Sequence, residues 1–262
     1  MKEIRRRPMR ADNLEPAAPH LAVVVPALRE AQNLPRLLTR TRKALCGLNL
    51  PYEIVVVDDD SRDGTREIVS AIASEDPRVR LLVREGERGL AGAILHGWQN
   101  TVAPILGVID ADGQHPPELL PRLLESVMDG SDVVIASRFV RGGKDCGSNL
   151  LRRTISAAAI LLTRPLQREW LRVADPLSGF FLVRRRCVES VLFQPAGFKL
   201  LLEILVRGRI HSVQELPFAF ARRNAGRSKI SLRVGWDYLS LLARLYATKF
   251  GRTGISQPAS GD

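Results

Sequence analysis

The chain has 262 residues but few cysteines and no long hydrophobic run. Cys46, Cys146 and Cys187 are odd in number and scattered, and no pair has metal-ligand spacing. This pattern argues against a disulfide framework and favours reduced thiols in the cytoplasm. No stretch approaches the ~20 apolar residues that a membrane-spanning helix needs, and the basic run at residues 5–7, followed by Pro8, is not a secretory signal. We therefore expect a chain that does not cross a bilayer by itself.

Glycine motifs that cradle phosphates are also missing. The chain has no G-x-x-x-x-G-K-S/T loop, and the glycines between Gly86 and Gly92 lack the spacing of a dinucleotide fingerprint. The phosphates of any bound nucleotide would therefore be held by a metal ion and cationic side chains. Aromatic residues make up only 5% of the chain and are not interleaved with basic ones, which argues against a module that stacks nucleic-acid bases.

Acidic charge is scarce relative to basic charge. The chain carries 39 Lys and Arg against 28 Asp and Glu, a net charge of +11. The excess is concentrated late: residues 138–186 hold eleven basic residues and three acidic ones, and residues 218–252 hold eight and one. Such a surface suits nucleic acid, an anionic membrane or phosphorylated substrates.

What the sequence does have is an alternation of strand and helix patterns. Strands are expected at 21–25, 53–57, 79–83, 105–109, 132–136, 180–183 and 210–216. Helices are expected around 34–45 and at 65–74, 91–100, 117–128, 150–163, 198–206 and 232–250. Strands joined by helices of this length predict an α/β fold with a mostly parallel sheet and helices on both faces.

Two acidic clusters follow strands of this predicted sheet. Asp110-Ala111-Asp112-Gly113-Gln114 comes after one strand, and Asp58-Asp59-Asp60-Ser61 comes after another. Carboxylates at the carboxyl ends of such strands point into the crevice where open α/β sheets bind ligands, and their oxygens suit a hard divalent cation. The alternative is that both clusters are polar turns whose side chains cap the following helices. In the earlier cluster, Asp59 suits a nucleobase or ribose, while Asp60, Ser61 and Asp63 suit capping.

The order of these segments resembles family 2 glycosyltransferases of GT-A fold, and within them the dolichol-phosphate mannose synthases. The resemblance spans residues 21 to about 232 and rests on a series of motifs in the order of that family. The motifs are Val25-Pro26 with Glu30, Asp58-Asp59-Asp60-Ser61, Asp63-Gly64-Thr65, Gly89-Leu90-Ala91-Gly92-Ala93, Asp110-Ala111-Asp112, Gln114-His115-Pro116-Pro117-Glu118, Ser137-Arg138, Asp175-Pro176 with Ser178-Gly179-Phe180, Gly197-Phe198 with Glu203, and Ser228-Lys229.

This resemblance implies a Rossmann-like GT-A domain that moves a hexose onto a dolichyl or polyprenyl phosphate. The expected donor is GDP-mannose, the expected cofactor is Mg²⁺ or Mn²⁺, and the reaction is expected to be an inverting single displacement. By the same resemblance, the metal would be held by Asp110, Asp112 and Gln114. The catalytic residues would be Asp112, Arg138 and Lys229, and the acceptor phosphate would meet Arg138, Arg152 and Arg153. The nucleotide-sugar site would comprise Pro26, Leu28, Glu30, Val57, Asp59, Asp110, Ala111, Asp112, Arg138, Arg223 and Lys229.

Some positions depart from the pattern of that family. Arg29 stands where Asn is usual, Leu28 where an aromatic is common, Asp60 where Gly is common, and Arg227 where an acidic or small residue is common. These departures leave open a UDP-sugar donor that carries glucose or an N-acetylhexosamine. A nucleic-acid-binding module and a non-catalytic subunit are alternatives from other functional classes. His115 is expected to pack or cap beside the metal loop, and Asp175 to serve either a turn or the site.

The resemblance also organises the chain into segments. Residues 1–19 are expected to form a disordered basic arm, 20–232 the GT-A domain, 233–252 a basic amphipathic helix and 253–262 a flexible tail. The amphipathic helix either lies on an anionic membrane surface, docks to a partner or simply packs on the domain. We expect peripheral association with the cytoplasmic face of a membrane, with a small membrane subunit as a possible partner, and no nucleic-acid partner.

Overall fold

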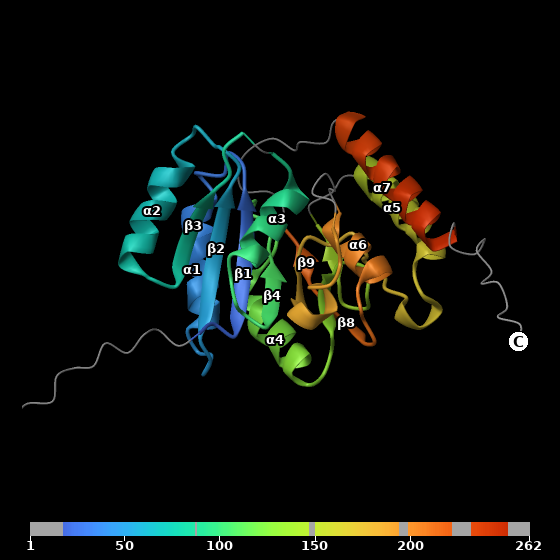
Figure 1. Ribbon diagram of the computed structural model, residues 1–262, viewed down its shortest axis with the longest axis horizontal. Coiled ribbons are helices and arrows are strands. Elements are labelled where there is room, and N and C mark those ends of the chain that lie inside the picture. The colour runs from blue at the N-terminus through green and yellow to red at the C-terminus, as the bar shows by residue number, and fades with distance from the viewer. Residues whose placement is uncertain (1–17, 87, 147–149, 194–198, 222–231, 251–262) are drawn as a thin grey trace, which may run out of the picture.

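A computed structural model describes residues 18–86, 88–146, 150–193, 199–221 and 232–250, with side chains for all of these except 150–153, 170 and 232–234. Its main sheet has seven strands in the order β3-β2-β1-β4-β7-β5-β8 (Figure 1). The strands are β1 Leu21–Ala27, β2 Tyr52–Asp58, β3 Val79–Val83, β4 Ile105–Val108, β5 Val133–Ser137, β7 Phe181–Arg184 and β8 Val213–Pro217. All pair in parallel except β7, which is antiparallel to both of its neighbours.

Helices cover both faces of this sheet. The helices next to the sheet are α1 Leu34–Leu45, α2 Thr65–Glu75, α3 Leu90–Gln99, α4 Leu120–Met128 and α6 Leu200–Arg207, while α5 Leu150–Thr163 and α7 Leu232–Phe250 lie further out (Figure 1). Val23 and Val25 of β1 pack with α1 and α4, whereas Val24 faces α3 on the opposite side. Successive strand residues alternate between the two faces, so a sheet covered on both sides has apolar residues at consecutive positions. The predicted α/β fold is confirmed.

The sequence did not reveal every element. A small second sheet pairs β6, Lys144–Asp145, with β9, Ala219–Phe220, and both strands are too short to leave an apolar pattern. Strand β8 begins at Val213, later than expected. Short 3₁₀ turns at Arg164–Leu166, Glu169–Leu171 and Arg185–Cys187 were also not predicted, and the helix expected at 117–128 begins with a 3₁₀ turn at Pro117–Leu119 before α4.

The last helix packs beside α5 (Figure 1). Leu241, Leu242 and Leu245 of α7 form an apolar cluster with Leu202 of α6. The Tyr238 hydroxyl donates a hydrogen bond to the carbonyl of Ala159 over 2.6 Å, and Tyr246 donates to Leu162 over 2.9 Å. One face of α7 is therefore a packing surface. None of the described helices is long and apolar enough to cross a membrane.

Part of the basic excess between residues 138 and 186 has a structural purpose. The Arg185 guanidinium donates to the carbonyl of Trp98 in the last turn of α3 over 3.3 Å, and to those of Thr101 and Ala103 in the loop after it over 2.9 and 2.8 Å. Arg184 donates in the same way at the end of α4, to the carbonyl of Val127 in the helix and to that of Ser131 after it. The last carbonyls of a helix lack intrahelical donors and carry partial negative charge, so cations stabilise them. These two arginines therefore do not indicate an anionic partner.

Candidate active site

The crevice lies where strand order reverses in the sheet. Strand β1 has β2 on one side and β4 on the other, and the acidic clusters follow β2 and β4 at their carboxyl ends. This is the place where open α/β sheets bind ligands. Both predicted acidic clusters thus meet at one edge of the sheet.

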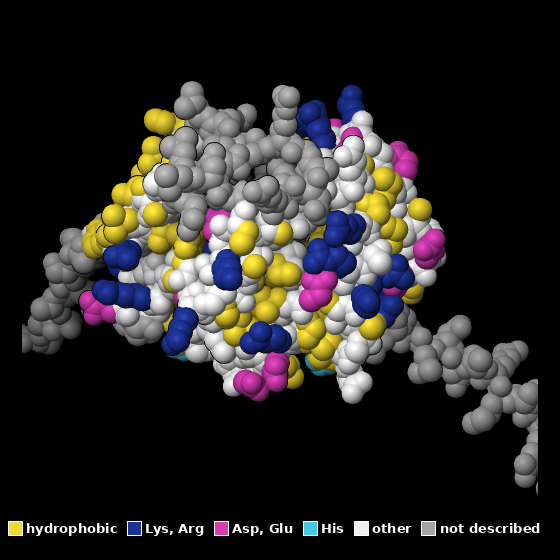
Figure 2. All heavy atoms as spheres, turned by 180° about the vertical axis from the view of Figure 1, so that it is seen from behind, with side chains coloured by type: hydrophobic (Ala, Val, Ile, Leu, Met, Phe, Trp, Pro, Cys, Tyr) yellow, Lys and Arg dark blue, Asp and Glu magenta, His cyan; other side chains and the backbone are white. Residues whose placement is uncertain are grey.

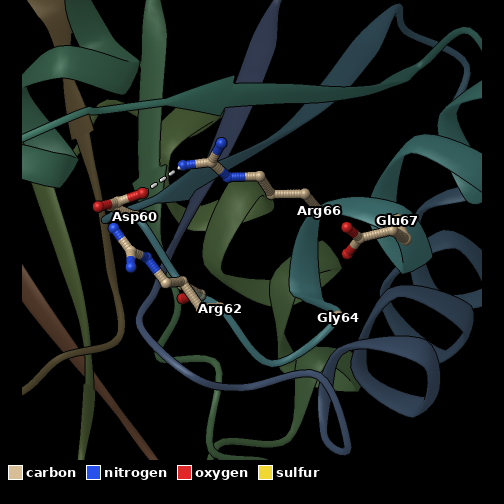
Figure 3. Close-up of a pocket in the computed structure, with 6 residues that line it drawn as sticks. Asp60, Arg62, Gly64, Arg66 and Glu67 are labelled. Carbon is tan, nitrogen blue, oxygen red and sulfur yellow. Dashed lines mark hydrogen bonds and ion pairs between the residues drawn. The ribbon is translucent and has the colours of Figure 1, made fainter.

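The turn after β2 is held by its own ion pairs (Figure 3). Buried Asp58 accepts hydrogen bonds from the Ser61 amide over 3.1 Å and from Arg66 Nε over 3.3 Å. Arg66 also donates to Asp60 over 2.6 Å. A pocket opens beside this turn, lined by Asp60, Ser61, Arg62, Gly64, Arg66 and Glu67.

Helix capping after β2 involves fewer residues than expected. Asp63 accepts hydrogen bonds from the amide of Thr65 over 3.2 Å and from its hydroxyl over 2.7 Å, so it binds the first amide of α2 from the residue before Gly64, which is the N-cap. Asp60 and Ser61 were expected to cap as well, but they have other partners: Asp60 pairs with Arg66, and Ser61 accepts from the Arg29 amide over 2.7 Å. Ser61 thereby ties the turn to the β1–α1 loop, and Asp60 ties it to the Arg66 side chain on α2.

Asp59 forms a buried clamp with an arginine that sequence reasoning missed. One of its oxygens accepts from Arg84 Nη1 over 3.0 Å, and the other accepts from the Gly89 amide over 2.8 Å. Both side chains of the ion pair are at most 6% exposed. Arg84 directly follows strand β3, and its position before the glycine segment is the signal that would have identified it.

The other predicted nucleotide-site residues come from β1, β2 and the loop after β1. Pro26 and Val57 are buried partners in the β1–β2 register. Glu30 is buried and accepts from Asn33 Nδ2 over 2.7 Å, while Leu28 is half-buried. Their contact with a nucleotide stays a prediction.

The loop after β4 places two carboxylates and one amide together. Asp110 and Asp112 are half-buried, and Ala111 between them is buried. Asp112 accepts from the backbone amide of Gln114 over 3.1 Å, and the side-chain Nε2 of Gln114 donates to the Ala221 carbonyl over 2.9 Å. Gly179 approaches so closely that a Cβ there would overlap the Asp110 carboxylate.

This donor set fits a magnesium-type ion. Across the described part of the chain, no group of three or more His, Cys, Asp and Glu side chains is arranged to hold a metal by itself. Mg²⁺ is commonly held by one or two carboxylates and completed by water and substrate phosphates. Asp110, Asp112 and the amide oxygen of Gln114 are hard oxygen donors of that kind.

His115 packs under this loop, as predicted. Its ring lies 5.4 to 5.5 Å from the rings of Phe180, Phe218 and Phe220. Burial, with smaller contributions from the positive charges of Arg138 and Lys199, lowers the pKa of His115 to about 3. The imidazole is therefore neutral near pH 7.

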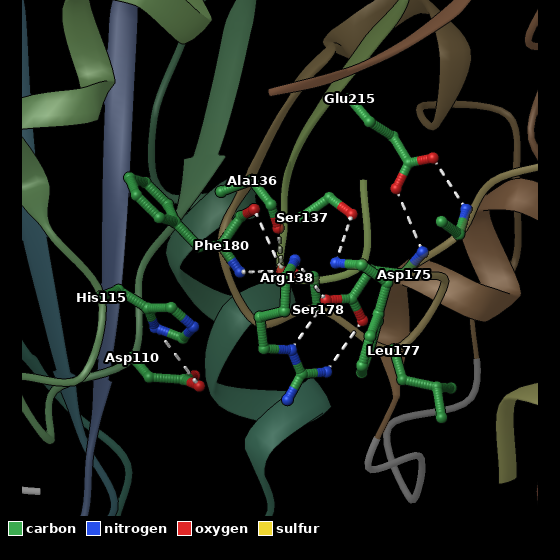
Figure 4. Close-up of polar contacts among 12 residues, drawn as sticks. Asp110, His115, Ala136, Ser137, Arg138, Asp175, Leu177, Ser178, Phe180 and Glu215 are labelled. Carbon is green, nitrogen blue, oxygen red and sulfur yellow. Dashed lines mark hydrogen bonds and ion pairs between the residues drawn. The ribbon is translucent and has the colours of Figure 1, made fainter. Parts of the chain in front are cut away.

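Arg138 is oriented by a buried carboxylate (Figure 4). Its Nε and Nη2 each donate to Asp175 over 2.8 Å, and Asp175 is fully buried. The guanidinium lies 5.0 Å from the ring centre of Phe139 and 5.3 Å from that of Phe220. Burial alone would lower the pKa of Arg138, but the hydrogen bonds and charge of Asp175 outweigh it and raise that pKa. Arg138 therefore stays cationic beside the acidic loop.

Lys199 is a second cation that sequence reasoning missed. Its ammonium donates to the Leu177 carbonyl over 3.1 Å. Burial lowers the pKa of Lys199, and the negative charge of nearby Asp110 partly offsets this effect. A single lysine just before an apolar helix gives no sequence pattern, so only the fold places it near the acidic loop.

Four predicted site residues are not placed by these observations. Arg223 and Lys229 lie outside the described residues. Arg152 and Arg153 lie on α5, but their side chains are outside the description. Their roles stay predictions.

Comparison with known proteins decides the family. Residues 22–201 match the family described as Glycosyl transferase family 2. The chain belongs to glycosyl transferase family 2. The resemblance seen in the sequence is thereby confirmed, and this membership does not favour a nucleic-acid-binding module.

Several curated relatives carry one name, dolichol-phosphate mannosyltransferase. The protein of Pyrococcus furiosus is 42% identical over 86% of this chain and 63% of its own length. That of Mycosarcoma maydis is 37% identical over 97% and 88%, and that of Saccharomyces cerevisiae is 36% identical over 89% and 90%. The chain thus spans less than two thirds of the Pyrococcus relative but most of the two fungal ones.

Solved structures share the fold. Glucosyl-3-phosphoglycerate synthase from Mycobacterium tuberculosis, in complex with Mn²⁺, UDP-glucose and phosphoglyceric acid, is 24% identical with a TM-score of 0.64 and covers 94% of this chain and 82% of its own. Mannosyl-3-phosphoglycerate synthase from Rubrobacter xylanophilus is 18% identical with a TM-score of 0.67, over 93% and 79%. At these identities the likeness concerns the fold alone.

Proposed function

We propose that this chain is an inverting polyprenyl-phosphate mannosyltransferase that takes mannose from GDP-mannose. The observation that carries the proposal is the meeting of the two acidic turns with Arg138 at one sheet edge, in a chain related to proteins named dolichol-phosphate mannosyltransferase. The nucleotide of the donor would lie along β1 and β2. The sugar of the donor and the phosphate of the acceptor would lie near Asp110 and Arg138.

The residue types fit a reaction between two anions. A lipid phosphate has a second pKa of about 6, so it is largely dianionic near neutral pH and attacks without a general base. The described crevice accordingly offers carboxylates and cations, and its histidine, His115, is kept neutral and buried. Arg138 would neutralise and orient the phosphate nucleophile at the anomeric carbon. Lys229 would act in the same way from the segment that lies outside the described residues.

A divalent metal would be held by Asp110, Asp112 and Gln114. Mg²⁺ and Mn²⁺ both accept such oxygen donors, and a bound ion would offset the charge of the departing diphosphate. We expect both ions to support activity. Removal of metal with EDTA should abolish transfer, and either ion should restore it.

Association with a membrane is proposed through α5 and α7. Trp236 on α7 is 71% exposed and Ile155 on α5 is 58% exposed, and further large apolar side chains of both helices are also open to solvent. These are Leu161 and Leu162 on α5 and Leu239 and Phe250 on α7. Hydrophobic side chains gather on the side of the molecule that carries these helices (upper left in Figure 2). Such a face suits the boundary between headgroups and acyl chains, on the cytoplasmic side, with or without a small membrane subunit.

The membrane proposal has a direct test. Co-sedimentation with anionic liposomes should be weakened by Trp236→Glu. The control is Leu192→Glu, because Leu192 is 86% exposed but lies outside α5 and α7. Equal binding by both variants would contradict the assignment of this surface.

The activity is tested with purified protein, metal and a short-chain polyprenyl phosphate. Radiolabelled GDP-mannose, UDP-glucose and UDP-N-acetylglucosamine are supplied in parallel. Label should enter the lipid from GDP-mannose only, with inverted anomeric configuration, and Asp112→Ala should abolish it. The matched control is Asp129→Ala, an exposed acid that follows α4. Transfer from a UDP-sugar alone would overturn the donor assignment, and retention of configuration would overturn the single displacement.

A further inference from the structure

Glu215 on β8 binds the turn that holds Asp175 (Figure 4). Its two carboxylate oxygens accept hydrogen bonds from consecutive backbone amides, Ala174 over 2.7 Å and Asp175 over 3.1 Å. Two bonds to neighbouring amides fix the orientation of the peptide plane between them. Pro176 follows at once and restricts the backbone of Asp175 further. The position of the Asp175 side chain is therefore set by Glu215.

Asp175 in turn sets the direction of Arg138. Its two oxygens accept from Nε and Nη2 over 2.8 Å, and Oδ2 also accepts from the Arg138 backbone amide over 3.2 Å. A guanidinium has five N–H donors, so this bidentate pair occupies two and leaves three outside the pair. Rings of Phe139 and Phe220 lie against the guanidinium and limit its rotation.

The two ends of this series of contacts lie on neighbouring strands of the sheet. Glu215 is the register partner of Ile135 on β5, and Arg138 directly follows that same strand. The hydrogen bonds from Arg138 through Asp175 to Glu215 therefore link strand β5 to strand β8, which already pair in the sheet. Side chains supported by strands and by hydrogen-bonded partners are held more precisely than those on free loops.

We infer that Glu215 is a positioning residue that acts on Arg138 through Asp175. This inference rests on the proposed function, because it takes the remaining donors of Arg138 to meet the phosphate of a polyprenyl phosphate. Glu215 itself does not touch the substrate. Its effect is to keep the Arg138 donors aimed at the acceptor phosphate.

The first test is the affinity for citronellyl phosphate, measured by calorimetry on the full chain. Glu215→Gln keeps the shape but replaces one acceptor oxygen with an NH₂ group, which cannot accept from a backbone amide. We expect the dissociation constant for citronellyl phosphate to rise about tenfold, as for the loss of one hydrogen bond to a charged group. The dissociation constant for GDP-mannose should not change. The control is Gln214→Ala, the neighbouring residue on β8, which should leave both constants unchanged.

A double-mutant cycle separates positioning from simple stabilisation. Arg138→Lys removes the bidentate pair, so adding Glu215→Gln to it should weaken citronellyl phosphate binding no further. Independent losses that multiply in the double variant would overturn the inference, because they would show that Glu215 does not act through Arg138. Turnover of GDP-mannose is measured separately: a wild type that binds citronellyl phosphate but transfers nothing would refute the proposed function, while the binding cycle still decides the role of Glu215.

Discussion

Arg84 occupies the space that a side chain at Gly92 would fill: a Cβ on Gly92 would lie 2.8 Å from Arg84 Nη2. Arg84 can reach Asp59 only because helix α3 has no side chain at this position. The glycine segment before and within α3 therefore accommodates a buried ion pair, and the Gly89 amide completes it. This relationship gives that segment a function other than a phosphate cradle.

Gly92→Ala should therefore weaken donor binding and lower stability. Alanine is favoured over glycine within a helix by about 1 kcal/mol, so the helix itself gains stability, while the methyl group displaces Arg84 from Asp59. We expect the dissociation constant for GDP-mannose to rise about tenfold, on the order of one charged hydrogen bond, and the melting temperature to fall, because the loss of a buried ion pair outweighs the gain in the helix. Calorimetry and thermal unfolding measure the two effects. The control is Gly235→Ala on α7, where nothing lies within 4 Å of the new Cβ.

Arg185→Met should lower stability but not specific activity. The variant leaves three carbonyls, Trp98 in the last turn of α3 and Thr101 and Ala103 in the loop after it, without their cationic donor. Hydrogen bonds to charged groups contribute about 1.5–3 kcal/mol, so we expect a loss of about 2–3 kcal/mol in the free energy of unfolding. Urea unfolding measures it. Arg122→Met is the matched control and should cost much less, because Arg122 lies exposed on α4. A drop in transfer per folded molecule for Arg185→Met would contradict a purely structural role.

These contacts show where sequence reasoning ends. The strands and helices were predictable because buried parallel strands give unbroken apolar runs such as Val55, Val56 and Val57. The two acidic turns were predictable because strand ends are positions that the alternation itself defines. Glu215, however, has its effect through backbone amides about forty residues away, and Lys199 reaches the acidic loop only in the folded chain. Single side chains of this kind leave no period or spacing in the sequence.

Arg29→Asn should stabilise the protein. Among the residues that the structure describes, Arg29 and Asp60 are the non-glycine residues with positive φ, at 58° and 56°. Both occupy positions where the sequence departs from Asn or Gly, the residue types that tolerate left-handed backbone best. We expect the free energy of unfolding to rise by about 0.5–1 kcal/mol, a part of the usual left-handed penalty of about 1–2 kcal/mol. Arg62→Asn, a neighbouring exposed arginine without positive φ, is the control for urea unfolding and should bring no such gain.

Protonation of His115 should destabilise the fold in acid. Burial lowers its pKa from 6.5 to about 3, so the unfolded chain binds a proton that the folded chain refuses between these values. Stability therefore falls as the pH drops below 6.5, by at most about 1.4 kcal/mol per pH unit from this one group, and the loss ends near pH 3. His115→Phe removes the titrating group and suits the surrounding ring cluster of Phe180, Phe218 and Phe220. Urea unfolding at pH 7.5 and pH 5 should show a smaller acid-induced loss for the variant than for the wild type. Equal losses in the two proteins would mean that His115 is free to take up its proton in the folded state.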